Sequence, residues 1–193
     1  MFNEIDFSKI DTSITPPQDD TERQYYYMAK LAEMVALRSG SWDGGLLIVC
    51  RRLGCQMNEK QSEVVAGIMD EIGFKRQETE DADVVIYNTC TVRENANLKV
   101  YGRLGKLHSL KKSNPDMKIA LFGCMMQEKQ VVDKIQKDYP FVNLVFGTHN
   151  IFKFAELFYE MENRDSQLID IWEGTDKIVE ELPTERNILL SPV

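Results

Sequence analysis

Short apolar runs alternate with helical patterns between residues 46 and 163, and this alternation limits the possible folds more than any other feature of the sequence. A single helical pattern follows each run. Strands joined by single helices pair in parallel through right-handed crossovers, because the helix returns the chain to the same end of the sheet. The sequence therefore predicts an α/β domain with a three-layer open parallel sheet, flavodoxin-like or Rossmann-like. The predicted strands are 46–49, 84–87, 119–122 and 144–146.

Local signals mark the ends of the predicted helices. Asn58 and Gln61 are spaced as a capping box at the start of the first, and Gly73 is placed to end it. The Asn-Pro pair at Pro115 ends the second helix, because the residue before proline disfavours helical backbone. Thr148 leads the last helix, after the fourth strand.

The sequence outside this region divides into two flanking parts. Residues 1–45 are predicted to be an N-terminal arm and helix: the arm is extended or mobile, and an amphipathic helix with Thr21 as N-cap packs on the main domain. Residues 46–163 form the α/β domain. The acidic, polar residues 164–193 are predicted to be a linker and a truncated tail.

Length and composition limit the class of protein. A chain of 193 residues can form one domain with a core plus flanking segments. No apolar run approaches the ~20 residues that span a bilayer, and the start lacks the regions of a secretory signal, so we expect a cytoplasmic protein without membrane partners. The net charge of −8 argues against binding nucleic acid by charge alone. We also expect a monomer.

Three of the four cysteines stand where a predicted strand ends: Cys55, Cys90 and Cys124, at intervals of 35 and 34 residues. In a reducing compartment, such thiols are metal ligands, catalytic groups or buried apolar side chains more often than disulfides. The carboxyl ends of parallel strands meet at one edge of the sheet, where α/β domains bind ligands. The repetition therefore predicts a shared metal or cluster site.

The kind of metal stays open at this point. Zinc prefers a fourth ligand, for which His149 is a better candidate than His108 because it lies just beyond the fourth strand. An iron–sulfur cluster normally takes four thiolates. With three, one iron keeps an exchangeable position, as in catalytic metal sites, and the site becomes a candidate for reaction.

Three motifs carry a family resemblance. They are Gly54-Cys55-Gln56-Met57-Asn58 followed by Ser62-Glu63, then Asn88-Thr89-Cys90-Thr91-Val92-Arg93, then Phe122-Gly123-Cys124-Met125. In this order and spacing, residues 46 to 163 resemble the N-terminal domain of the radical-SAM methylthiotransferases. The resemblance implies that Cys55, Cys90 and Cys124 bind an auxiliary [4Fe-4S] cluster that takes part in sulfur insertion.

The motifs most resemble the branch of the family that modifies tRNA. This implies addition of a methylthio group to C2 of N(6)-isopentenyladenosine next to the anticodon, with tRNA bound through the full-length enzyme. In the family, a second [4Fe-4S] cluster on a Cys-x-x-x-Cys-x-x-Cys motif cleaves S-adenosylmethionine. These 193 residues contain no such motif, so we expect them to be inactive alone.

Two other functions remain open: a stand-alone iron–sulfur or metal-binding module, and a methylthiotransferase for threonylcarbamoyladenosine tRNA or a ribosomal protein.

The sequence departs from the family pattern around 41–53 and after Arg186, and codons read one base out of frame can generate both departures. We therefore expect a frame-shifted fragment of a longer gene, in which Cys50 is no ligand; the alternative is a deliberately shortened chain or a short paralogue. For the densest basic stretch, a solvated helix face is favoured over RNA contact; it comprises Arg93, Lys99, Arg103, Lys106, Lys111 and Lys112.

Overall fold

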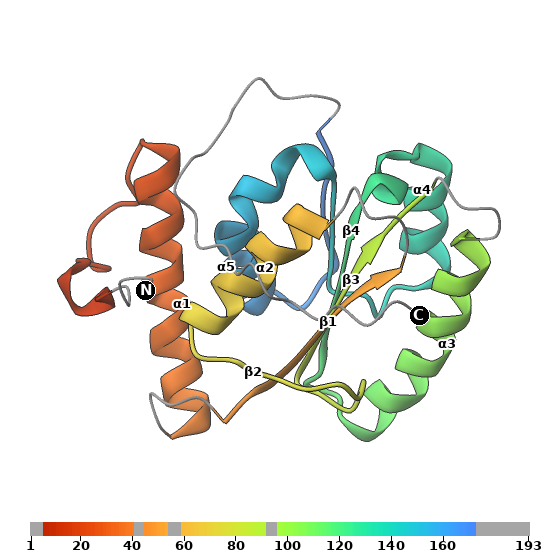
Figure 1. Cartoon of the computed structure of the whole chain (residues 1–193), viewed down its shortest axis with the longest axis horizontal. Helices are drawn as coiled ribbons and strands as arrows, with labels where there is room; N and C mark the ends of the chain where they lie inside the picture. Colours follow the sequence, from red (N-terminus) through yellow and green to blue (C-terminus); the bar gives the residue numbers. More distant parts are fainter. Residues whose placement is uncertain (1–5, 41–44, 54–58, 92–95, 173–193) are drawn as a thin grey trace.

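The computed structural model describes residues 6–40, 45–53, 59–91 and 96–172. The described residues form one six-stranded, all-parallel sheet with the strand order β2-β1-β3-β4-β5-β6 (Figure 1). The strands are β1 (Leu47–Leu53), β2 (Lys75–Arg76), β3 (Val84–Thr89), β4 (Lys118–Gly123), β5 (Leu144–Phe146) and β6 (Leu168–Asp170). The α-helices are α1 (Asp20–Ser39), α2 (Glu59–Glu71), α3 (Ala96–Ser113), α4 (Lys129–Asp138) and α5 (Phe154–Glu162).

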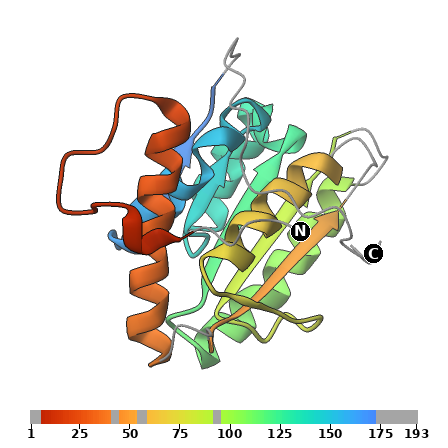
Figure 2. The ribbon, with the colours of Figure 1, turned by 60° about the vertical axis from the view of Figure 1, so that its left-hand side comes forward.

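Helices cover both faces of the sheet, so the predicted three-layer α/β fold is confirmed (Figures 1 and 2). Alternate residues of each strand enter different cores because successive strand side chains point to opposite faces. On β3, Ile86 packs with side chains of α1, α2 and α5. Its neighbours Val85 and Tyr87 pack with side chains of α3 and α4. Burial on both faces explains why the central strands are continuous apolar runs in the sequence.

The order of the strands fixes where a ligand would bind. From β1 the chain crosses to β2 on one side and then to β3 on the other, so the sheet changes winding direction between β1 and β3. Ligands of open α/β sheets bind beyond the carboxyl ends of the strands at such a switch point. The carboxyl ends of β1 and β3 therefore border the expected binding position, and the end of β4 lies next to that of β3.

Helix α1 packs against α5, as predicted, and Arg23 Nε donates to Glu156 Oε1 at 3.0 Å. Its N-cap differs from the prediction: the carboxylate of Asp19 accepts the backbone N–H groups of Thr21 and Glu22. Asp19 is favoured because Thr21 already lies inside the first turn. Where the sequence predicts an extended or mobile arm, residues 6–19 include the short 3₁₀ helix η1 (Phe7–Lys9) and lie against α1 through the Tyr26 hydroxyl.

Two strands and one helix differ from the sequence pattern. Strand β2 was not predicted because both of its residues are exposed and polar. Strand β6 lies in the segment predicted as a linker, although it pairs with β5 along its whole length. After β5 the chain first forms the 3₁₀ helix η4 (Thr148–Lys153), and α5 begins only at Phe154. The predicted stop at Gly73 is confirmed by its φ of +98°.

The division of the chain into arm, domain and tail stays a prediction. Within the described residues, no helix is long and apolar enough to cross a membrane.

Candidate metal centre

The register of the sheet brings two of the three predicted ligands to adjacent positions. Leu53 of β1 pairs with Thr89 of β3, and Thr89 pairs with Gly123 of β4. Cys90 and Cys124 each follow directly after these aligned residues. They therefore leave neighbouring strands at the same level of the sheet edge. Cys55, two positions after Leu53 in the sequence, lies outside the described residues.

The sulfur of Cys124 lies against the main chain at the end of β3. The backbone N–H of Thr91 donates to Cys124 Sγ at 3.3 Å, and the Thr91 hydroxyl lies 3.8 Å from the same sulfur. The Cys124 thiol is placed to donate to the carbonyl oxygen of Thr89 at 3.6 Å. Cys90 is fully buried and Cys124 is partly buried, and neither forms a disulfide. One sulfur is thus held by the chain segment that carries the other cysteine.

Gly123 allows this close approach. Its φ of +112° is a conformation that residues with a side chain rarely adopt. A Cβ atom at this position would lie 2.2 Å from the carbonyl oxygen of Thr89 and 2.8 Å from its nitrogen. Neither backbone atom can move without disturbing the β3–β4 pairing. The glycine before Cys124 is therefore a geometric requirement of the site.

Two polar residues of the second motif fasten β3 to its neighbours. The Asn88 amide donates to the Ser62 hydroxyl at 2.8 Å, which ties the end of β3 to α2. The Thr89 hydroxyl donates to the carbonyl oxygen of Phe122 at 2.7 Å, which ties it to β4. All three side chains are buried, so each bond replaces hydration lost on folding. These bonds hold the end of β3, which Cys90 directly follows, against α2 and β4.

The donor set that the structure describes fits a thiolate-bound metal or cluster. Two cysteines end adjacent strands, and a backbone N–H is directed at one sulfur, as in iron–sulfur sites where hydrogen bonds to sulfur tune the cluster. Among the described residues, no three Cys, His, Asp or Glu side chains form a metal-binding group. Because Cys55 is not among them, the three-cysteine site stays a prediction.

The two histidines lie elsewhere in the fold. The His108 ring, on α3, stacks on Phe141 with 4.6 Å between ring centroids. His149 belongs to η4, after β5 and not at the end of β3 or β4. The fourth-ligand role considered for His149 stays a prediction.

Cys50 differs from the other described cysteines. It lies inside β1, paired with Ile86, and its side chain packs against the core formed by α1, α2 and α5. Burial raises the pKa of the Cys50 thiol to about 12, so it stays protonated at neutral pH. Its position inside β1, before the edge at which Cys90 and Cys124 lie, supports leaving Cys50 out of the site.

The basic side chains of α3 make structural contacts. Arg103 and Lys106 lie 2.9 and 2.7 Å from the carboxylate of Glu80, which also accepts the hydroxyl of Tyr87 at 2.7 Å. Lys111 donates to two oxygens at the amino end of β5, and burial lowers its pKa to about 8. Arg103, Lys106 and Lys111 therefore bond within the fold, which differs from the solvated helix face that the sequence predicts.

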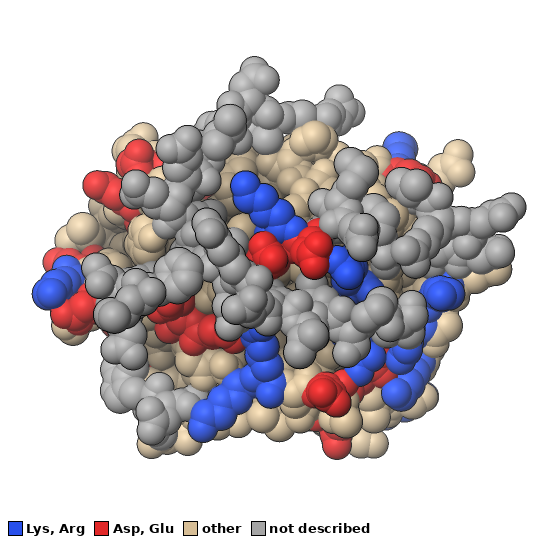
Figure 3. All heavy atoms as spheres, in the orientation of Figure 1, with Lys and Arg blue, Asp and Glu red and all other residues tan. Residues whose placement is uncertain are grey.

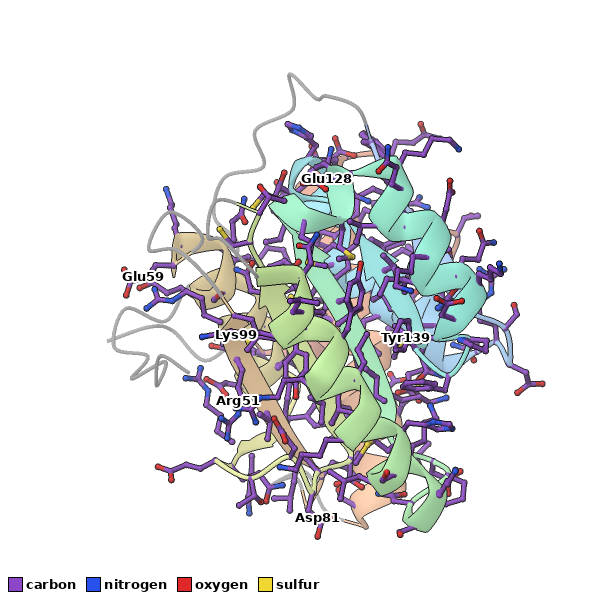
Figure 4. The ribbon with its side chains drawn as sticks, turned by 90° about the vertical axis from the view of Figure 1, so that its right-hand side faces the viewer. Arg51, Glu59, Asp81, Lys99, Glu128 and Tyr139 are labelled. Carbon is purple, nitrogen blue, oxygen red and sulfur yellow. The ribbon has the colours of Figure 1, made fainter. Side chains whose placement is uncertain are left out.

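In Figure 4, α3 crosses in front of the sheet, with Lys99 toward its first turn. Figure 3 shows the molecule from a different side, where basic and acidic side chains are interspersed.

Two positioning features were missed from the sequence. The bond from Thr91 to Cys124 depends on the pairing of β3 with β4, which no local pattern reveals. A signal for Gly123 did exist, because glycine also precedes the first predicted ligand, at Gly54.

The comparisons with known proteins agree with this arrangement. The sequence matches the uncharacterized protein family UPF0004 over residues 48–147. It is 63% identical to the tRNA-2-methylthio-N(6)-dimethylallyladenosine synthase of Lachnoclostridium phytofermentans over 133 residues, which are 69% of this chain and 29% of that protein. The synthase of Clostridioides difficile is 48% identical over 75% of this chain and 30% of its own length.

A third relative extends the match. The synthase of Thermoanaerobacter sp. is 40% identical over 91% of this chain and 36% of its own length. The chain thus spans about a third of the length of these relatives. The family match covers more than half of the chain and includes two cysteines at the described edge, and it agrees with the motifs in the sequence. The chain therefore belongs to the UPF0004 family, the N-terminal domain of the methylthiotransferases.

Proposed function

We propose that this chain is the part of a tRNA methylthiotransferase that binds the auxiliary [4Fe-4S] cluster, with Cys55, Cys90 and Cys124 as the ligands. The observation that carries the proposal is the alignment of Cys90 and Cys124 directly beyond the paired residues Thr89 and Gly123. Two thiols on neighbouring rigid strands are preorganised for one metal group. On this proposal the third thiol is that of Cys55, which follows β1 in the sequence, and β1 is the strand on the other side of β3.

The proposed ligand set gives the cluster a reactive position. Three thiolates would each coordinate one iron of the cluster. The fourth iron would then keep an exchangeable coordination site for sulfur chemistry. The protein's own contribution is positional. Gly123 lets β4 approach β3, and the Thr91 N–H stabilises negative charge on Cys124.

The relatives' name indicates the substrate. We propose that the complete enzyme adds a methylthio group to C2 of N(6)-isopentenyladenosine in tRNA, next to the anticodon. S-adenosylmethionine and a second [4Fe-4S] cluster would belong to sequence beyond the family match. Residues 1–193 carry no Cys-x-x-x-Cys-x-x-Cys motif, and on this proposal they do not catalyse the reaction alone. The reaction would take place in the cytoplasm.

A chimeric enzyme tests this function. Residues 46–172 replace the matching part of the Lachnoclostridium phytofermentans synthase, and tRNA carrying the isopentenylated nucleoside is analysed by mass spectrometry after reaction. We expect the methylthio product with the chimera and none with its Cys90→Ala variant. Cleavage of S-adenosylmethionine by both proteins shows that the part of the chimera taken from the synthase is intact. A chimera that cleaves S-adenosylmethionine and holds both clusters, yet forms no methylthio product, contradicts the proposal.

A further inference from the structure

The contacts of Thr91 extend beyond its place in the cysteine motif. It follows Cys90 in the sequence, but its backbone N–H and hydroxyl both lie near the sulfur of Cys124, at 3.3 and 3.8 Å. Cys124 comes from a different strand and is 33 residues away. A single residue after one predicted ligand therefore provides two hydrogen-bond donors to another.

The geometry around Cys124 makes these contacts specific. The sulfur also lies 3.6 Å from the carbonyl oxygen of Thr89, which can accept a proton from a thiol but repels a thiolate. When the cysteine becomes a thiolate ligand, this acceptor loses its partner and the two donors of Thr91 gain strength, because hydrogen bonds to charged groups are the stronger ones. Gly123, which has a φ of +112° and pairs with Thr89, places Cys124 beside the end of β3.

Hydrogen bonds to cysteine sulfurs stabilise negative charge on an iron–sulfur cluster. Reduction adds one electron, so each such bond favours the reduced state and raises the reduction potential. We propose that Thr91 is a positioning residue whose hydroxyl, beside the backbone N–H, holds Cys124 Sγ and raises the reduction potential of the bound cluster. This inference rests on the proposed function, because it requires the cluster to bind at these cysteines.

The experiment compares the full wild-type chain with three single variants of it. Thr91→Val has nearly the same shape and keeps the backbone N–H but removes the hydroxyl, whereas Thr91→Ser keeps both donors. Thr12→Val is the matched control, since it removes a threonine hydroxyl of the N-terminal arm that donates to Glu33 on α1. Each protein is reconstituted anaerobically with iron and sulfide, and its iron content is measured. The cluster is then titrated with dithionite and followed by absorbance and electron paramagnetic resonance.

We expect equal iron and sulfide contents in all four proteins, with a more negative potential in Thr91→Val alone. Serine should restore the wild-type potential, which a purely structural role for the side chain would not predict. If Thr91→Val folds but loses iron while Thr91→Ser retains it, the positioning role is supported more strongly. A fully loaded Thr91→Val protein with the wild-type potential overturns the inference, as does equal iron loss in both Thr91 variants. If the wild-type chain binds no iron and sulfide, the proposed function itself fails.

Discussion

At the level of single residues, the approach of β4 to β3 depends on Gly123. We predict that Gly123→Ala lowers the free energy of unfolding by about 2 kcal/mol or more, because strained backbone costs of order 1–3 kcal/mol before any collision is counted. The new Cβ would also meet the carbonyl oxygen of Thr89 at 2.2 Å. Urea unfolding followed by circular dichroism measures the loss.

Gly102 provides the control for this substitution. It lies inside α3, and a Cβ there would meet nothing within 4 Å. Gly102→Ala should therefore stabilise the chain by about 0.5–1 kcal/mol, the gain expected from alanine in a helix interior. Equal stability of Gly123→Ala and the wild type would show that β4 can withdraw from β3 without cost, against the geometry described above.

The candidate site could be predicted only in part from single residues. Cys90 and Cys124 were predicted because each follows an apolar run, and strand ends are visible in the sequence. The bond between Thr91 and Cys124 and the contact of Gly123 with Thr89 depend on register, which arises from pairing between residues more than 30 positions apart. Hydrophobic periodicity indicates which face of the sheet a residue lies on. It does not identify the residue of another strand that pairs with it.

At the level of elements, Glu80 ties the segment before β3 to α3. Its side chain is buried, and it contacts Arg103, Lys106 and the Tyr87 hydroxyl. Burial alone would raise the pKa of Glu80, but the bonds from Lys106 and Tyr87 and the charge of Arg103 outweigh it and hold the pKa below its ordinary value. The ionised carboxylate therefore stabilises the folded state.

This network predicts a dependence of stability on pH. A carboxylate with a lowered pKa in the folded state stabilises fully above its unfolded pKa of about 4.3 and loses that contribution as pH falls through the folded value. We expect Glu80→Gln to lower the free energy of unfolding by about 1–3 kcal/mol at pH 7. The difference from the wild type should shrink below about pH 4 as the wild-type carboxylate becomes protonated.

Urea unfolding at pH 7, 5, 4 and 3 checks this expectation. Glu78→Gln serves as the control, since Glu78 is exposed in the same segment and should change stability little at any of these values. A Glu80→Gln effect that is constant with pH would mean that the charge of the carboxylate does not contribute.

The strands that were predicted and those that were missed differ in a physical way. The four predicted strands are apolar because both faces of the sheet centre are buried. Strands β2 and β6 lie at the sheet edges; they have two and three residues, and β2 is wholly exposed. Only their pairing with β1 and β5 identifies them as strands. β2 contains no apolar residue, and the two apolar residues of β6, Leu168 and Ile169, are too short a run to predict a strand.

At the level of the whole molecule, the paired basic side chains of α3 and the candidate metal centre lie on different parts of the fold. The chain carries a net charge of −8, and the Arg103 and Lys106 side chains pair with a buried carboxylate. Neither observation favours this chain as the main RNA-binding part of an enzyme, because phosphate contacts require available cations. The carboxyl edge of the sheet, by contrast, gathers two aligned cysteines. This distribution is consistent with a domain that holds a cofactor for a reaction to which other parts of the enzyme contribute.

The central claim is that one cluster binds at the ends of three neighbouring strands. Its most direct test is the iron and sulfide content, after anaerobic reconstitution, of the wild-type chain and of four single variants: Cys50→Ala, Cys55→Ala, Cys90→Ala and Cys124→Ala. The wild type and Cys50→Ala should each bind about four irons and four sulfides, as one [4Fe-4S] cluster requires. The other three variants should lose most of both. Full binding by Cys90→Ala or Cys124→Ala, or loss of binding in a folded Cys50→Ala protein, would contradict the assignment.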